Sequence, residues 1–257
     1  MTTISLKKTI EDSSKNAAIS LKKIGLSDTK ANIILALDVS GSMDYMYGNK
    51  SVQDFVLRIL GLAKNFNTTA ELPVYVFGDT AKKIGVFDIN NITETKIKEA
   101  YSVNHVGRST NFTQLFNLIT KEYDSKNKSP ILKVGFFKRI YRAIFNIPSE
   151  NVNLVGNNIL PTYVVVMTDG EPSDSSSAIE ALVRASNLPI FFQFVAISRN
   201  TIPFLEKLDT DVKGRLIDNA NVFYSETPNY YSDEVLYNKL LQEFPAYLKE
   251  AKLINLI

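Results

Sequence analysis

Hydrophobic residues occur along this chain in two patterns: continuous apolar runs, and runs in which they recur at every third or fourth position. Three continuous runs have few polar interruptions, as expected of strands that helices cover on both faces of a parallel sheet. They are "ANIILALD" (31–38), "TYVVVMTDG" (162–170) and "LPIFFQFVAIS" (188–198). The weaker strand candidates are residues 71–79, a shorter segment at 82–88, and 221–225.

The periodic runs predict amphipathic helices, because residues three and four positions apart share one face of a helix. Five segments have this spacing: 52–66, 93–101, 111–123, 174–187 and 232–252. Asp174 and Ser232 stand at the start of two of them and are predicted N-caps. Pro245 is expected to kink the last helix or to split it in two.

Strands and helices alternate along the chain, which favours an α/β fold with a doubly wound, mainly parallel sheet flanked by helices. We expect one main domain over residues 31–252. Residues 1–30 are expected to form an N-terminal arm, either helical or extended, since their polar and apolar positions follow no clean period. A basic and aromatic insertion is expected at about residues 125–160.

The composition narrows the chemistry. Of the 257 residues, 45% are hydrophobic, which is enough for one sizeable core. There is no cysteine, so disulfides, thiolate metal sites and a thiol nucleophile are excluded. The N-terminus lacks the apolar segment of a signal peptide, and no run approaches the roughly 20 apolar residues of a membrane helix. The expected location is the cytoplasm.

The net charge of +2 is unevenly distributed. Residues 126–142 hold six lysines and arginines and no acid, and in the rest of the chain acidic residues outnumber basic ones. We call residues 126–147, which also contain "GFFKRIYRAIF", the basic segment. It packs on the domain, or presents a patch for a protein partner, or binds an anionic membrane surface. Nucleic acid is an unlikely partner, because the excess of positive charge is local.

Three polar clusters fall where the carboxyl ends of the predicted strands should lie. Asp38, Ser40 and Ser42 follow the first buried strand in "DVSGS", Thr110 precedes a helix in "GRSTNF", and Asp169 closes the second buried strand in "TDGEPSD". In an open parallel sheet, ligands bind outside the carboxyl ends of the strands. These five residues are therefore expected to form one site.

Two carboxylates and three hydroxyls offer oxygen ligands only, which suits a hard divalent cation. Mg²⁺ takes about six oxygen ligands near 2.1 Å, and Mn²⁺ or Ca²⁺ is possible on the same donors. Alternation along "DVSGS" directs Asp38, Ser40 and Ser42 to the same side, and Gly41 permits a bend between the serines. The five residues thus predict a metal site.

Other polar residues near these positions have simpler interpretations. Asp44 is expected to be a solvated loop residue, and Glu171 to support the site or tune its partner preference. His105, the only histidine, is interpreted as a loop residue. With no second histidine or cysteine, no Ser-His-Asp arrangement is evident, and we do not expect an enzyme.

The arrangement Asp-x-Ser-x-Ser, then a distant Thr, then Thr-Asp-Gly resembles the metal-ion-dependent adhesion site (MIDAS) of von Willebrand factor A (vWA) domains. The chain is also similar, from about residue 15 onward, to the vWA domain at the C-terminus of TerF-type tellurium-resistance proteins. The similar stretches are "NIILALDVSGSM", "PIFFQFVAIS", "FLEKLDT", "GRLIDNANVFYS" and "SDEVLYNKLLQEFPAYLKEA".

The resemblance implies a vWA fold over 31–252 with Mg²⁺ at one edge of the sheet. It implies that Ser40, Ser42 and Thr110 bind the metal directly, and that Asp38 and Asp169 act directly or through water. One coordination position would stay open for an acidic side chain of a protein partner. The implied setting is a bacterial or phage tellurite and stress-resistance system, in the cytoplasm or peripherally at the inner face of the membrane.

Two other functions stay open at this stage. A Mg²⁺-dependent phosphoester hydrolase would need a base or nucleophile near the metal, and Asp38 is the only carboxylate on the first loop. A copine-like, lipid-associated module would use the same fold at a membrane surface. Turnover of phosphate esters and sedimentation with liposomes distinguish these alternatives from a protein-binding module.

Overall fold

The computed structural model describes residues 3–67, 69–102, 106–127 and 159–257. Its centre is a six-stranded sheet in the order β3-β2-β1-β4-β5-β6. The strands are β1 (Asn32–Asp38), β2 (Leu72–Phe77), β3 (Ala81–Phe87), β4 (Thr162–Thr168), β5 (Ile190–Ala196) and β6 (Ala220–Tyr224). Only β3 is antiparallel to its neighbour. The predicted α/β, doubly wound sheet is confirmed.

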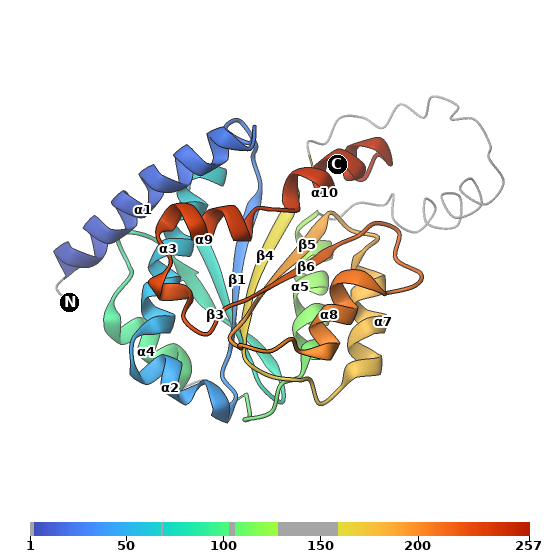
Figure 1. Ribbon diagram of the computed structural model, residues 1–257, viewed down its shortest axis with the longest axis horizontal. Helices are drawn as coiled ribbons and strands as arrows, with labels where there is room; N and C mark the ends of the chain where they lie inside the picture. The colour runs from blue at the N-terminus through green and yellow to red at the C-terminus, as the bar shows by residue number, and fades with distance from the viewer. Residues whose placement is uncertain (1–2, 68, 103–105, 128–158) are drawn as a thin grey trace.

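Helices cover both faces of the sheet, which explains why its central strands are apolar throughout (Figure 1). One face carries α1 (Thr3–Lys23), α3 (Ser51–Phe66), α9 (Asp233–Leu240) and α10 (Phe244–Leu253). The other face carries α5 (Phe112–Asn127), α7 (Ser175–Ala185) and α8 (Pro203–Thr210). The shorter α2 (Asp44–Gly48) and α4 (Glu94–Ser102) lie beside α3.

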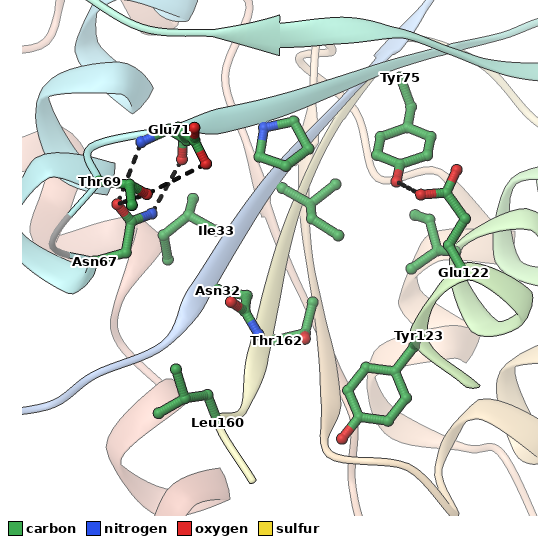
Figure 2. A pocket seen from close by; sticks show the side chains of 13 residues that line it. Asn32, Ile33, Asn67, Thr69, Glu71, Tyr75, Glu122, Tyr123, Leu160 and Thr162 are labelled. Carbon is green, nitrogen blue, oxygen red and sulfur yellow. Dashed lines mark hydrogen bonds between the residues drawn. The ribbon is translucent and has the colours of Figure 1, made fainter. Parts of the chain in front are cut away.

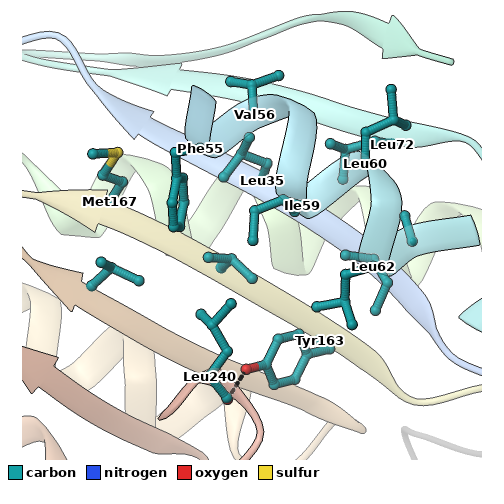
Figure 3. Close-up of a cluster of buried hydrophobic side chains, with 14 of the residues drawn as sticks. Leu35, Phe55, Val56, Ile59, Leu60, Leu62, Leu72, Tyr163, Met167 and Leu240 are labelled. Carbon is teal, nitrogen blue, oxygen red and sulfur yellow. Dashed lines mark hydrogen bonds between the residues drawn. The ribbon is translucent and has the colours of Figure 1, made fainter. Parts of the chain in front are cut away.

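The core on the α3 side is built by one almost fully buried helix. Phe55 and Ile59 of α3 lie over Leu35 of β1, and all three are fully buried (Figure 3). The hydroxyl of Tyr163 on β4 donates a hydrogen bond to the carbonyl of Leu240 at the end of α9. This bond ties the C-terminal helices to the central strand and satisfies a buried hydroxyl.

The N-terminal segment is helical rather than extended. In α1, Leu6 and Ile10 are buried in the same cluster as β1 and α3. The contact with α3 is close, since a Cβ on Gly61 would lie 2.8 Å from the Cβ of Ser13. A glycine is needed here to let two helices approach this closely.

The C-terminal helix is split, as Pro245 indicated. Ser232 caps α9 by accepting a hydrogen bond from the amide of Val235, and Pro245 occupies the first turn of α10. Proline is accepted there because a first-turn amide has no partner within the helix. Helix α8 was not predicted, because its eight residues are too short for a clear period.

Two further findings concern membrane contact. No helix in the described ranges is long and apolar enough to cross a bilayer. Nearly all of the basic segment lies outside the described residues, as does most of the insertion expected at 125–160. Both therefore stay predictions.

Candidate metal centre

The five residues singled out in the sequence meet at one edge of the sheet and are joined by hydrogen bonds. The amide of Ser40 donates to the Asp38 carboxylate at 2.7 Å, and the Thr110 hydroxyl donates to the same carboxylate at 3.3 Å. The hydroxyls of Ser40 and Ser42 are 3.2 Å apart, and Ser42 donates to Asp169 at 2.8 Å. Asp38, Ser40, Ser42, Thr110 and Asp169 thus form one connected group.

The order of the strands explains where in the sheet these five residues lie. The chain leaves β1 toward β2 on one side and continues from β4 to β5 on the other, so the winding reverses between β1 and β4. Asp38 ends β1, and Asp169 directly follows β4. Ligands of doubly wound sheets bind at such a switch point. In Figure 1 this edge is the lower one, where α2 follows β1.

Residues 38–43 comprise the last residue of β1 and the loop that follows it, and we call them the metal loop. Two contacts with the body of the protein hold this loop in place. The amide of Val39 continues the pairing with β2 by donating to the Phe77 carbonyl at 3.0 Å, and the side chain of Met43 is fully buried. Between these anchors, Ser40 is nearly buried and Ser42 is exposed. The loop therefore has one hydroxyl on the protein side and one toward solvent.

Thr168 is a member of the site that the sequence analysis missed. Its hydroxyl donates to the Asp38 carboxylate at 2.5 Å, and both side chains are fully buried. The Asp38 carbonyl accepts a further hydrogen bond from the Tyr47 hydroxyl at 2.9 Å. Thr168 is the threonine of the Thr-Asp-Gly motif, so its position next to Asp169 in the sequence could have identified it as a candidate site residue.

Burial raises the pKa of both carboxyl groups. The pKa of Asp38 rises to about 6, chiefly because burial disfavours the charged form; hydrogen bonds from Thr168 and Ser40 oppose this, and the charge of Asp169 adds to it. Burial also raises the pKa of Asp169, against a hydrogen bond from Ser42. Two neighbouring carboxylates in this environment are stabilised in the charged form by a bound cation.

The donor set fits a hard divalent cation. It consists of carboxylate and hydroxyl oxygens, and the described residues contain no group of three or more His, Cys, Asp or Glu side chains placed to hold a metal. Any ion at this edge would therefore depend on Ser40, Ser42 and Thr110. Gly170 keeps the space open, since a Cβ there would come within 3.3 Å of the Thr110 hydroxyl.

Thr110 is held by the turn that follows β2. We call residues 106–111 the Thr110 loop. The amide of Thr80 donates to the Val106 carbonyl at 2.8 Å, and the amide of Ser109 donates to the Asp79 carboxylate at 2.9 Å. Hydrogen bonds from the side chain and then the amide of Ser109 lower the pKa of Asp79. Asp79 therefore positions the Thr110 loop. It can do so because the turn after β2 and the Thr110 loop, which are 30 residues apart in the sequence, lie side by side in the structure.

Asp174 occupies the N-cap position of α7, as predicted, but its side chain makes no hydrogen bond to that helix. Its carboxylate instead accepts from the amides of Phe112 and Thr113, at 3.2 and 2.7 Å. Asp174 therefore caps α5, which begins two residues after Thr110. The loop after β4 thereby holds the Thr110 loop, reinforced by the Ser173 amide donating to the Thr110 carbonyl at 2.9 Å.

The remaining candidates lie around the site. Asp44 is exposed, as expected, but it begins helix α2 instead of lying in a loop, and it pairs with Arg108 at 2.7 Å. Glu171 accepts a long contact of 3.5 Å from the amide of Phe204, so it supports the start of α8. His105 lies outside the described residues.

A separate hollow of about 410 Å³ lies at the opposite edge, where β1 and β4 begin at Asn32 and Thr162 (Figure 2). Polar groups on its wall bond to each other: the Tyr75 hydroxyl donates to Glu122 at 2.7 Å, and Asn67, Thr69 and Glu71 form a second set. The ligand-binding geometry of the fold is at the other edge.

A doubly wound sheet with an Asp-x-Ser-x-Ser loop at its switch point is the architecture of a vWA domain. Residues 30–139 and 141–256 match the model of the vWA-TerF-like family, described as the vWA found in the TerF C terminus. The chain belongs to this family.

One curated protein and several solved structures are similar to this chain. The uncharacterized protein YcbR of Bacillus subtilis (strain 168) is 31% identical over 248 residues, which cover 95% of this chain and 88% of that protein. The manganese-loaded TRAP protein of Plasmodium vivax has a similar fold, with a TM-score of 0.50 and 14% identity, over 84% of this chain and 73% of that chain. Proximal thread matrix protein 1 of the mussel byssus is 17% identical with a TM-score of 0.45; the match covers 88% of this chain and 49% of that chain.

Proposed function

We propose that this chain is a metal-dependent protein-binding module. Its five-residue site would hold Mg²⁺, or Mn²⁺ or Ca²⁺, and the metal would take an acidic side chain of a protein partner as a further ligand. The observation that carries the proposal is the meeting of two carboxylates, one of them fully buried, and three hydroxyls at the switch point of the sheet.

The residues would divide the work. Ser40, Ser42 and Thr110 would contact the metal, while Asp38 and Asp169 would balance its charge directly or through water. Because the hydroxyls are neutral, the bound ion would keep a strong attraction for one more anion. Ser42 is exposed, so a partner could approach from this side. That a protein of the same fold is described as manganese-loaded supports a divalent ion here.

The family suggests a setting for this activity. We propose a role in a bacterial or phage tellurite and stress-resistance system, in the cytoplasm or peripherally at the inner face of the membrane. The contribution would be the binding of a protein partner rather than chemistry on tellurium, since the chain has no cysteine to bind or reduce a tellurium oxyanion.

The test has two arms. Calorimetry should show one Mg²⁺ or Mn²⁺ per chain for the wild type and none for Asp38→Ala. Capture from the native cell should then depend on Mg²⁺, be lost with EDTA, and weaken in Thr110→Ala but not in Ser198→Ala, a control after β5. Absence of metal binding by the wild type would overturn the proposal, and turnover of phosphate esters that Asp38→Ala abolishes would favour the hydrolase.

A further inference from the structure

Arg108 lies directly beside the metal loop. A Cβ on Gly41, between the two serines, would come within 3.3 Å of its Nη2 atom. The same nitrogen donates to both carboxylate oxygens of Asp44 at 2.7 Å. Arg108 belongs to the Thr110 loop, and Asp44 follows the metal loop, so this ion pair joins the two loops on the solvent side of the site.

The Arg108–Asp44 pair is open to exchange. The side chains are 57% and 55% exposed. An ion pair so exposed gains little net free energy, because water solvates and screens both charges. Another carboxylate of suitable geometry can therefore replace Asp44 without disturbing the core.

We expect Arg108 to keep its position without Asp44, because its guanidinium also contacts the hydroxyl and the ring of Tyr101. Its Nη1 atom donates to the Tyr101 hydroxyl at 2.9 Å, and its guanidinium carbon lies 5.7 Å from the centre of that ring. Tyr101 stacks on Tyr47 at 4.2 Å, and Tyr47 donates to the Asp38 carbonyl at 2.9 Å. The guanidinium is thus oriented before any partner binds, which reduces the entropy lost on binding.

A hollow of about 490 Å³ adjoins the pair. Asp44, Tyr47 and Tyr101 line it together with Lys50 and Lys98. It offers room for a partner side chain beside Asp44 and Tyr101, the two residues that contact Arg108. Lys98 adds positive charge to its wall, whereas Lys50 is paired with Glu94 at 2.9 Å. An acidic chain is the occupant that this charge favours.

We propose that Arg108 is a second anion site beside the metal centre, and that the partner presents two carboxylates. One would bind the metal, and the other would displace Asp44 from Arg108. This inference rests on the proposed function and extends it from a single acidic side chain to an acidic motif. Arginine suits this task, because its planar group pairs with a carboxylate in defined geometry.

The experiment uses short synthetic glycine–serine peptides that carry either one aspartate or two aspartates at increasing separations. Binding is measured by fluorescence anisotropy at saturating Mg²⁺, set from each variant's own metal titration, and again in EDTA. Wild type should bind the best two-aspartate peptide about threefold more tightly than the one-aspartate peptide, a modest gain because the new pair is exposed and replaces the pair with Asp44. Arg108→Ala should lose this advantage, and Asp44→Ala should increase it.

The opposite signs separate this role from a structural one. If Arg108 and Asp44 served only to join the loops, both substitutions would lower affinity for both peptides alike, and that result would overturn the inference. Arg184→Ala and Glu180→Ala are matched controls on α7, where the arginine is also 57% exposed and ion-paired, and both should behave as wild type.

Failure of the proposed function is distinguishable. If the wild-type protein binds neither peptide in Mg²⁺, the metal-dependent module itself is wrong. If it binds both peptides equally and only in Mg²⁺, the metal site stands and the second anion site is wrong.

Discussion

Asp38 is the residue on which the proposed metal site depends most, and the burial of its charge, which disfavours folding, would be offset by a bound cation. The carboxyl is fully buried, and its pKa is raised to about 6, chiefly by that burial. Without a cation, its charged form therefore destabilises the folded protein above pH 6. With a divalent cation bound, the same charge becomes favourable.

We expect Asp38→Asn to abolish Mg²⁺ binding and to stabilise the metal-free protein at pH 8. The asparagine keeps the shape of the side chain and removes its buried charge, and a pKa shift of this size corresponds to up to about 3 kcal/mol of stability. Urea unfolding with EDTA and with Mg²⁺ measures both effects. Asp211→Asn, an exposed residue, is the control and should change neither. A variant that is less stable than wild type in EDTA at pH 8 would contradict this account.

Asp209 gives a second pH dependence, away from the site. Its pKa is raised to about 7, first by burial and then by the charges of Glu243, Asp218 and Glu206. Because the folded pKa lies above the unfolded one, the folded protein loses stability as pH rises from about 4 through 7. At higher pH the penalty is complete.

Asp209→Asn should therefore stabilise the protein at pH 8 and leave its stability at pH 4 nearly unchanged. The measurement is the urea midpoint across this range for both proteins with EDTA present. The difference between them should grow steadily with pH. A constant difference at every pH would show that Asp209 acts through packing or hydrogen bonding instead of its charge.

At the level of residues, sequence reasoning found the site through spacing. Alternation along the metal loop and the Thr-Asp-Gly motif identified the candidate oxygens, and all of them meet in the structure. Thr168, Asp79 and Arg108 could not be assigned in the same way. Their roles depend on which distant loops become neighbours, and a threonine, an aspartate or an arginine in a turn has many simpler explanations.

Among the elements, the start of α5 matters most for the site. Asp174 accepts hydrogen bonds from two amides of its first turn, just after Thr110. These amides have no partner within the helix, and the negative charge interacts favourably with the helix N-terminus. The cap thus couples the Thr110 loop to the loop that carries Asp169.

Asp174→Ala should lower the free energy of unfolding by about 1 kcal/mol, the usual effect of losing a cap, and should also weaken Mg²⁺ binding. The second effect is expected because Thr110 would no longer be held at its place. Ser232→Ala removes the cap of α9, far along the chain, and is the matched control. It should cause a similar loss of stability with unchanged Mg²⁺ affinity; equal metal affinity in both variants would refute the coupling.

Element prediction succeeded where period and length were clear. The helix at 52–66 is fully buried along one side and was recognised from its apolar spacing, and Pro245 marked the break between α9 and α10. The N-terminal helix was left undecided, since serines occupy two positions of its buried face, Ser13 and Ser20, while Ile4 and Ile19 are exposed. Asp174 stands at the N-cap position of α7, as predicted, but its hydrogen bonds to α5 could not be foreseen because an N-cap side chain normally serves the helix that follows it.

The whole molecule explains why five residues from three loops form one group. Parallel strands all end at the same edge, and at the reversal between β1 and β4 the connections that follow these two strands lead to opposite sides. The sequence indicated this class of sheet through alternating strands and helices. It could not show the position of α1, since no local pattern specifies which helix packs on which.

The packing of α1 predicts that this helix contributes to the free energy of unfolding of the domain and is not an appended arm. Its buried residues Leu6, Ile10 and Leu21 share one cluster with β1 and α3, and Asn65 of α3 donates to the Ser14 carbonyl at 3.0 Å. Burying a large apolar side chain contributes about 1.5–3 kcal/mol, so deletion removes several kcal/mol from a total of roughly 5–15.

We therefore expect a chain that begins at residue 25 to unfold at a much lower urea concentration than the full chain. Saturating Mg²⁺ should raise its midpoint, because ligand binding stabilises the folded state even when that state is marginal. Gly61→Ala should move the full chain in the same direction, since its added methyl would meet the backbone amide of Ser14 at 2.9 Å. Gly48→Ala, where nothing lies within 4 Å of the added carbon, is the control. An unchanged midpoint for the shortened chain would mean that α3 keeps its core without α1, and that the domain is stable from residue 25 onward.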